Sequence, residues 1–323
     1  MLKVEKGNDS MLDIQPGIEA RRALLEKYLS GELLPTRKAA GAATHLSPGK
    51  TSSGREHVIP IQTQGTKRPF FYLHGDWTDN AFFCFPLAHL VGEDQPFYIL
   101  TPYDFHGLDV LPPLEEVAAA HITSLREIQP EGPYLLGGFC NGGLTAYEMA
   151  RQLQSQGERV DLLVLMDAIP PRTQAICSAI KRCGKMTETG QAKQLDLYLR
   201  MEHAYRYLVD KHSDDFEHIS KSDPRIGAYF PPTETLRKEY PAMFTWATAH
   251  YQPTFYQGKV TLFWDEAEPF RRKWWHTWAK KQDQDVEEYI MPGTHFSCKT
   301  DYLEGMAACL RACLSLIPSA VAL

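Results

Sequence analysis

The sequence lacks an excess of basic residues, and this excludes nucleic acid as a default partner. Its 34 lysine and arginine residues stand against 40 aspartate and glutamate residues, so the formal net charge at pH 7 is −6. A surface that binds phosphate groups normally shows as a basic excess. We therefore expect no nucleic-acid partner.

Cysteine is sparse, and its spacing excludes two structural uses. The seven cysteines are Cys84, Cys140, Cys177, Cys183, Cys298, Cys309 and Cys313. None forms a CxxC pair or a Cys/His set with the spacing of a zinc site. Seven are also too few for a disulfide scaffold in a chain of this length. The sequence therefore predicts free thiols in a reducing compartment.

Long apolar runs are missing as well. The first residues, MLKVEKGNDS, carry charges where a signal peptide needs an apolar segment, and the apolar tail after Arg311 is too short to cross a bilayer. The chain of 323 residues is 43% hydrophobic and 23% charged, which is typical of a globular protein with a sizeable core. We expect a soluble, cytoplasmic protein without a membrane partner.

The first 57 residues differ in pattern from the rest of the chain. Residues Ile18 to Leu29 mix apolar and charged side chains with a helical period that ends at Ser30-Gly31. Residues 35–57 contain many small, Pro and Gly residues and almost no large apolar ones, which is typical of a linker. We predict an N-terminal helix and flexible linker over residues 1–57 and one domain over residues 58–323.

From residue 58 onward, short apolar runs alternate with helical periodicity. The predicted strands are Val58–Ile61, Phe70–His74, Phe97–Leu100, Tyr134–Gly138, Leu162–Met166, Val260–Trp264 and Glu287–Ile290. The predicted helices between them are Leu87–Val91, Leu114–Ile128, Leu144–Gln156, Phe270–Lys280 and Tyr302–Leu316. Such alternation is typical of an α/β protein with a mostly parallel sheet and helices on both faces.

One crossover between strands is abnormally long. It runs from Asp167 to Lys259, several times what a single returning helix needs. Within it, Gln191–Lys211 and Glu234–Tyr251 have helical patterns. We predict that residues from about 170 to 250 form a helical lid over the end of the sheet.

Residues 134–153, YLLGGFCNGGLTAYEMARQL, contain a G-x-nucleophile-x-G motif with cysteine at its centre. An apolar strand enters Gly138-Phe139-Cys140-Asn141-Gly142, and an amphipathic helix follows. Such an elbow needs small residues on either side of the nucleophile, because strand and helix approach closely there. A helix N-terminus also stabilises a thiolate. The pattern predicts Cys140 as nucleophile, and it does not fit the G-x-G-x-x-G fingerprint of dinucleotide binding.

The general base is expected after the last strands, because the chain order for such an elbow is nucleophile, acid, base. His295 lies in YIMPGTHFSC, where a strand is followed by Pro292-Gly293 and a polar loop. Its ring can therefore reach the carboxyl edge of the sheet, where ligands collect. We predict His295 as the base.

Two carboxylates compete for the role of orienting this base. Asp167 ends the apolar strand LLVLMD, and Asp265 ends the next strand, VTLFWD. An aspartate in such apolar surroundings is costly unless it has a hydrogen-bonded partner such as an imidazole. The residues alone leave both candidates open.

The oxyanion hole requires two backbone N–H groups that converge on one oxygen. We expect one from Asn141, directly after the nucleophile. The second is expected from the loop in FFYLHGDWTD, and its position favours Asp76, with Trp77 as neighbour.

The segment PFRRKWWHTW, residues 269–278, combines aromatic and basic residues. A docking role for an acidic partner is one interpretation. The pattern favours another, an amphipathic helix whose tryptophans pack on the sheet while Arg271, Arg272 and Lys273 are solvated.

Taken together, these blocks resemble a known family. From about Val58 to Leu316 the chain is similar to thioesterase domains of nonribosomal peptide and polyketide synthases, which have the α/β-hydrolase fold. The matching blocks, in order, are IPIQTQGTKRPFFYLHG, DQPFYIL, IQPEGPYLLGGFCNGGLTAYEMARQLQSQG, LVLMDAIPP and MPGTHFSC. In that family the acid follows the strand with LVLMDA, so the resemblance favours Asp167 over Asp265.

The chain departs from the family pattern at two places. Cys140 stands where the family usually has serine, as in a cysteine-bearing branch, and HGDWTD replaces the usual HGxGG. The N-terminal EARRALLEKYLSGEL resembles linker helices between synthase modules. No carrier domain can be read in the residues before the predicted domain, so we expect the chain to act on a carrier protein in trans.

The resemblance implies a cysteine-dependent thioesterase or acyltransferase with a triad of Cys140, His295 and Asp167. It would take an acyl or peptidyl chain from the phosphopantetheine arm of an acyl or peptidyl carrier protein and release it by hydrolysis, transfer or cyclisation. No metal or redox cofactor is implied. Two alternatives stay open: a free-standing cysteine hydrolase of small esters or lactones, and a catalytically inert carrier-binding protein.

Overall fold

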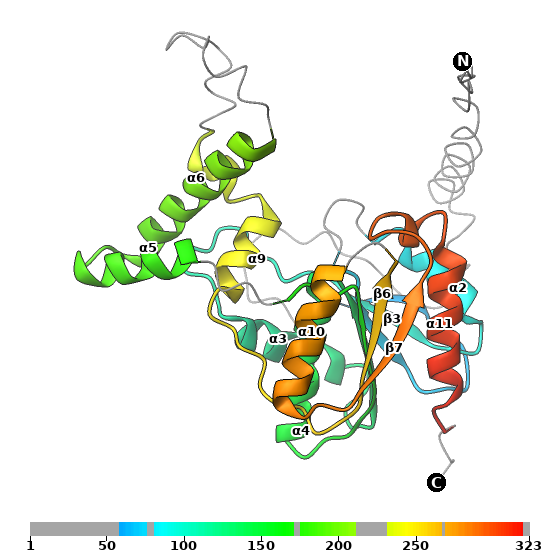
Figure 1. Cartoon of the computed structure of the whole chain (residues 1–323). Helices are drawn as coiled ribbons and strands as arrows, with labels where there is room; N and C mark the ends of the chain where they lie inside the picture. The colour runs from blue at the N-terminus through cyan, green and yellow to red at the C-terminus, as the bar shows by residue number, and fades with distance from the viewer. Residues whose placement is uncertain (1–57, 76–80, 171–174, 211–230, 267–268, 319–323) are drawn as a thin grey trace, which may run out of the picture. The chain divides into compact units, whose positions relative to one another are not determined.

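The computed structural model describes residues 58–75, 81–170, 175–210, 231–266 and 269–318 (Figure 1). The predicted N-terminal helix and linker lie outside the described residues. Asp76 and Trp77, in the loop predicted to complete the oxyanion hole, also lie outside them.

Seven strands of the described chain form one sheet in the order β1-β3-β2-β4-β5-β6-β7. They are β1 (Val58–Gln62), β2 (Phe70–Leu73), β3 (Phe97–Leu100), β4 (Tyr134–Phe139), β5 (Val160–Met166), β6 (Val260–Asp265) and β7 (Val286–Met291). β1 pairs antiparallel with β3, and the other neighbours are parallel. All the predicted strands are confirmed, with small differences at their ends. Every residue of β2, β4 and β6 is buried, as continuous apolar runs in a parallel sheet require.

Helices cover both faces of the sheet. The flanking helices are α2 (Cys84–Val91), α3 (Leu114–Arg126), α4 (Asn141–Ser155), α10 (Pro269–Gln282) and α11 (Leu303–Ser315). Figure 1 shows α2 beside α11 on one side of the sheet and α3, α4 and α10 on the other. The predicted α/β architecture is therefore confirmed.

The two faces carry two separate apolar cores. Successive residues of a strand point to opposite faces, and β2 divides accordingly. Phe71 and Leu73 belong to the cluster with α3, α4 and α10, whereas Phe70 and Tyr72 belong to the cluster with α2 and α11. No helix in the described part of the chain has the length and apolar character needed to cross a membrane.

The long crossover between β5 and β6 contains additional helices, as predicted. They are α5 (Ala175–Met186), α6 (Gln191–Asp210), α8 (Thr233–Leu236) and α9 (Tyr240–Thr248), named here the cap. The helix predicted at Glu234–Tyr251 is wrong as one unit. It is split into α8 and α9 because Pro241 lies in the first turn of α9, where a missing N–H is tolerated. The helix α5 was not predicted.

Polar contacts connect the cap to the core. Arg237, just after α8, donates hydrogen bonds of 2.9 Å to Asp196 on α6 and to Asp109 in the segment before α3. After α9, the Tyr251 hydroxyl donates a buried hydrogen bond of 2.9 Å to Glu148 on α4. The cap is thus attached at both sides of α9.

Candidate active site

Cys140 lies in the sharp turn between β4 and α4. Its backbone has φ 53° and ψ −117°, an unusual conformation for a residue with a side chain. A Cβ at Gly138 would lie 2.3 Å from the carbonyl carbon of Gly142, and one at Gly142 would lie 2.2 Å from the carbonyl oxygen of Leu73. The strand, turn and helix predicted from the motif are all present, and only glycine fits at the two flanking positions.

The start of α4 provides a donor next to Cys140. Asn141 is the first residue of this helix, so its N–H belongs to the turn whose N–H groups have no intrahelical acceptor. Gly75, after β2, approaches the elbow so closely that a Cβ there would lie 1.8 Å from the Phe139 carbonyl oxygen. The loop predicted to supply the second donor therefore begins against the elbow. The donor itself, Asp76, lies outside the described residues and stays a prediction.

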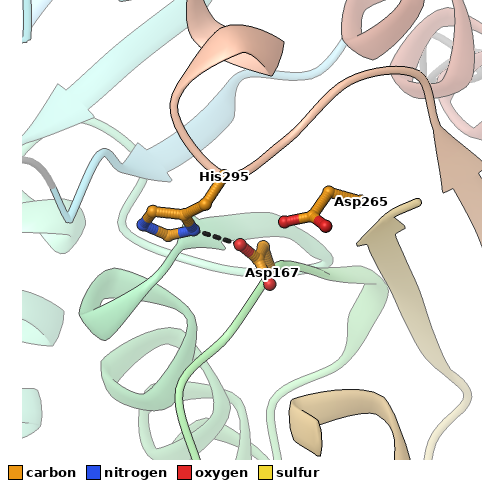
Figure 2. Close-up of side chains that lie close together, drawn as sticks. All are labelled: Asp167, Asp265 and His295. Atoms are coloured by element: carbon orange, nitrogen blue, oxygen red, sulfur yellow. Dashed lines mark hydrogen bonds and ion pairs between the residues drawn. The ribbon is translucent and has the colours of Figure 1, made fainter. Parts of the chain in front are cut away.

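His295 follows β7 and lies at the same edge of the sheet. Its Nδ1 is hydrogen-bonded to Asp167 Oδ2 (Figure 2). Its ring stacks on Phe139, with ring centroids 4.7 Å apart, and Cys140 lies close enough to raise the pKa of the imidazole. The structure thus brings the predicted nucleophile, base and acid together from three separate loops.

The surroundings of His295 favour its protonated form. Burial lowers the pKa of His295, but the hydrogen bond to Asp167 and the proximity of Cys140 raise it, to about 9 from an ordinary value of 6.5. An imidazolium next to the Cys140 sulfur can hold the proton that a thiol loses when it becomes a nucleophile.

Both candidate acids lie close to the imidazole. Asp167 and Asp265 follow neighbouring strands, and both are buried. One ligand atom from each of Asp167, Asp265 and His295 lies within 4.8 Å of the others (Figure 2). The hydrogen bond from His295 to Asp167 is the geometry that orients an imidazole, so the structure places Asp167 in the position expected of the acid.

Arg271, on α10, is a member of this cluster that the sequence analysis missed. Its Nη1 donates a 2.5 Å hydrogen bond to Asp167 Oδ2. The expectation that Arg271 is solvated is therefore wrong, because its side chain is 19% exposed and paired with a fully buried carboxylate.

A signal for Arg271 was present in the sequence. It occurs a few residues after Asp265, where a helix starts at the carboxyl edge of the sheet. The tryptophan part of the earlier interpretation is confirmed, since Trp275 and Trp278 are buried in the core.

A small cavity of about 20 Å³ lies beside the elbow. Most of its lining is apolar or aromatic, and the polar residues in it include His121, Asn141 and Thr145. Among the described residues, the buried Asn141 Nδ2 has no hydrogen-bond partner. The cavity is large enough for one water molecule, which could satisfy that donor.

The model of the thioesterase domain family matches residues 88–313. The chain belongs to this family. The matched region contains Cys140, Asp167 and His295, together with the cap and all but the first two strands.

Relatives of this thioesterase-family chain include large synthases. The dimodular nonribosomal peptide synthase of Bacillus subtilis (strain 168) is 36% identical over 166 residues, which are 51% of this chain and 7% of that protein. The non-reducing polyketide synthase PFUR17_0229 of Pseudevernia furfuracea is 32% identical over 145 residues, 43% of this chain and 7% of that protein. The chain thus matches only a small part of the length of these relatives.

Solved structures show the same fold. The NocB thioesterase domain from the nocardicin cluster aligns with a TM-score of 0.52 and 21% identity, covering 80% of this chain and 99% of that one. The four-domain nonribosomal peptide synthetase AB3403, bound to AMP and glycine, aligns with a TM-score of 0.52 and 21% identity, covering 81% of this chain and 20% of that one. The predicted α/β-hydrolase fold is confirmed.

Proposed function

We propose that this chain is a thioesterase that accepts an acyl or peptidyl chain onto Cys140 from the phosphopantetheine arm of a carrier protein acting in trans. The observation that carries the proposal is the strained elbow of Cys140 next to the hydrogen-bonded pair of His295 and Asp167. Membership of the thioesterase family and the likeness to peptide and polyketide synthases support the class of substrate.

In the first half of the reaction, the Cys140 thiol gives its proton to His295. The sulfur then attacks the thioester carbonyl carbon, and the backbone N–H of Asn141 stabilises the oxygen that becomes negative. When the tetrahedral intermediate collapses, the bond to the phosphopantetheine sulfur breaks and that sulfur takes the proton from the imidazolium. One thioester has been exchanged for another, and Cys140 carries the acyl group.

In the second half, His295 acts as base for the group that releases the chain. It accepts a proton from water, or from a hydroxyl or amine, as that group attacks the acyl carbon. The bond to the Cys140 sulfur breaks, and the sulfur regains a proton from His295. Water gives the free acid, whereas a nucleophile within the acyl chain gives a ring. Because the intermediate is a thioester, it keeps the activation needed for transfer or cyclisation.

The test is intact-mass spectrometry of the protein after incubation with a panel of acyl-carrier thioesters. We expect one acyl group on Cys140, and a loss of turnover of at least about 10³-fold in Cys140→Ala. Cys140→Ser should retain part of the activity, because the elbow also suits a hydroxyl. Cys183→Ala is the matched control, since Cys183 is an exposed free thiol in the cap and should be dispensable.

The alternative functions give different results in the same experiment. Rapid turnover of small esters or lactones, with carrier-bound substrates ignored, would assign the chain to free-standing cysteine hydrolases. Binding of a carrier without any adduct on Cys140 would show an inert carrier-binding protein. An adduct on another cysteine, with full activity in Cys140→Ala, would contradict the proposed nucleophile.

A further inference from the structure

Arg271 is in direct contact with the predicted acid and close to the predicted base. Its Nη1 lies 2.5 Å from Asp167 Oδ2 and 2.9 Å from His295 Nδ1. A ring nitrogen that donates its hydrogen to Asp167 cannot also accept one from Arg271. The attractive interaction of Arg271 is therefore with Asp167. The guanidinium and the imidazolium are both positively charged, so they repel each other.

The groups around His295 carry opposing charges. They are Cys140 from the elbow, Asp167 and Asp265 from the ends of β5 and β6, Arg271 from α10, and Cys298 and Lys299 from η3 (Ser297–Lys299). Burial raises the pKa of Cys298 to about 12, so this thiol is neutral. Lys299 Nζ lies 5.3 Å from the centroid of the Phe139 ring, on which His295 stacks. Arg271 is in contact with both members of the acid–base pair.

The balance of these charges changes during the proposed reaction. In the free enzyme, Cys140 and Asp167 both raise the pKa of His295 and so favour the imidazolium. After acylation the Cys140 sulfur no longer contributes, but Asp167 remains hydrogen-bonded to the ring. An imidazole that keeps its proton cannot accept one from water, so release of the chain needs something that opposes the imidazolium.

We propose that Arg271 is a positioning residue of this site: its guanidinium holds the Asp167 carboxylate and opposes positive charge on His295, which keeps the imidazole able to act as base when the acyl chain is released. This role rests on the proposed function. It predicts that Arg271 matters more for release of the chain from Cys140 than for loading.

The experiment compares two substitutions of Arg271 with one of its neighbour. Arg271→Gln removes the charge and keeps a hydrogen-bond donor, whereas Arg271→Lys keeps the charge. Arg272→Gln is the matched control, because Arg272 is 46% exposed and pairs at 3.0 Å with Glu288 at the surface. Each protein is mixed with hexanoyl-pantetheine and quenched at successive times between about pH 6 and pH 10, a range that spans histidine titration. Intact mass then gives the rates at which the Cys140 adduct forms and decays.

The decay rate of the Cys140 adduct should rise with pH as His295 loses its proton, and this rise is called here the acid limb. In Arg271→Gln we expect the acid limb to lie about one pH unit higher, because a charge that opposes the imidazolium has been removed. On that limb, decay should be about tenfold slower than in the unmodified protein. Adduct formation should change much less. Arg271→Lys and Arg272→Gln should keep the original limb.

Two results would overturn this role. If Arg271→Gln forms the adduct normally and the acid limb of its decay rate lies at the same pH as in the unmodified protein, the guanidinium does not act on His295. An equal shift in Arg271→Lys shows that lost packing, rather than lost charge, is responsible. Absence of any Cys140 adduct in the unmodified protein is a different result, because it overturns the proposed function and this role with it.

Discussion

Asp167 and Asp265 show how two residues with similar sequence contexts acquire different positions. Both end buried apolar strands, and both lie near His295. The hydrogen bond to His295 Nδ1 and the contact with Arg271 are made by Asp167. The backbone of Asp167 has a φ of 44°, an uncommon value for a non-glycine residue, as is frequent at functional sites.

The two acids can be separated by paired substitutions. Asp167→Asn should lower turnover by about 10⁴-fold, because an amide no longer fixes the imidazole tautomer that accepts the proton. Asp265→Asn should lower it much less. Both rates are measured with the same acyl thioester, and circular dichroism checks that each variant is folded. A larger loss in Asp265→Asn would transfer the role of the acid to Asp265.

Among the residues of the site, the sequence predicted the positions of those that lie in a recognisable local sequence pattern. The position of Cys140 follows from glycines and a strand-to-helix change, and that of His295 from its place after the last strand. The place of Arg271 after Asp265 indicates the carboxyl edge of the sheet, but its contact with Asp167 could not be predicted in this way. Its contact partner, Asp167, is 104 residues away in the chain, and only the order of the strands brings the two together.

Among the elements, the cap differs most from its prediction. The core strands were predictable because a buried parallel strand needs an apolar residue at nearly every position. The helix α5 carries a different signal: in AICSAIKRCGKM, Ile176, Ile180 and Cys183 recur at helical spacing. A glycine near its end and the lack of an acidic residue in its first turn make the helix less evident from the sequence.

Arg237 provides a test of what the cap does. Arg237→Ala removes the ion pairs to Asp196 and Asp109 that connect α8 with α6 and with the core. We expect the ratio of kcat/KM for long and short acyl thioesters to change, because the cap is then held less firmly over the site. The Tm should fall by less than about 4 °C, since ion pairs that water reaches are weak.

The control for Arg237 is an ion pair outside the cap. Lys259→Ala removes a surface pair to Glu287 on β7 and should leave chain-length preference unchanged. If both variants keep the original preference, the cap does not select the acyl chain. If Arg237→Ala fails to fold, the cap belongs to the structural core of the domain.

For the molecule as a whole, His295 makes the stability depend on pH. Its pKa is about 9 in the folded protein and 6.5 in an unexceptional environment, so the folded state holds the proton more firmly. The stabilisation of the folded state by the proton on His295 is complete below pH 6.5 and is lost as the pH rises to about 9. At most it contributes about 3 kcal/mol.

Urea denaturation at a series of pH values measures this dependence. The free energy of unfolding should decline between about pH 6.5 and pH 9, and the decline should be smaller in His295→Gln. His276→Gln is the control, because His276 pairs with Glu288 at the surface, outside the cluster. An equal decline in His295→Gln would assign the pH dependence to other groups.

The order of the active-site residues along the chain has a consequence for biosynthesis. The elbow and Asp167 precede the cap, whereas Arg271 and His295 come only with the final two strands and the helix between them. A ribosome that has completed β5 therefore carries a nascent chain with the proposed nucleophile but without the proposed base. Under the proposed function, such a chain cannot cleave thioesters in its surroundings until most of the domain has been synthesised and the last strand has joined the sheet.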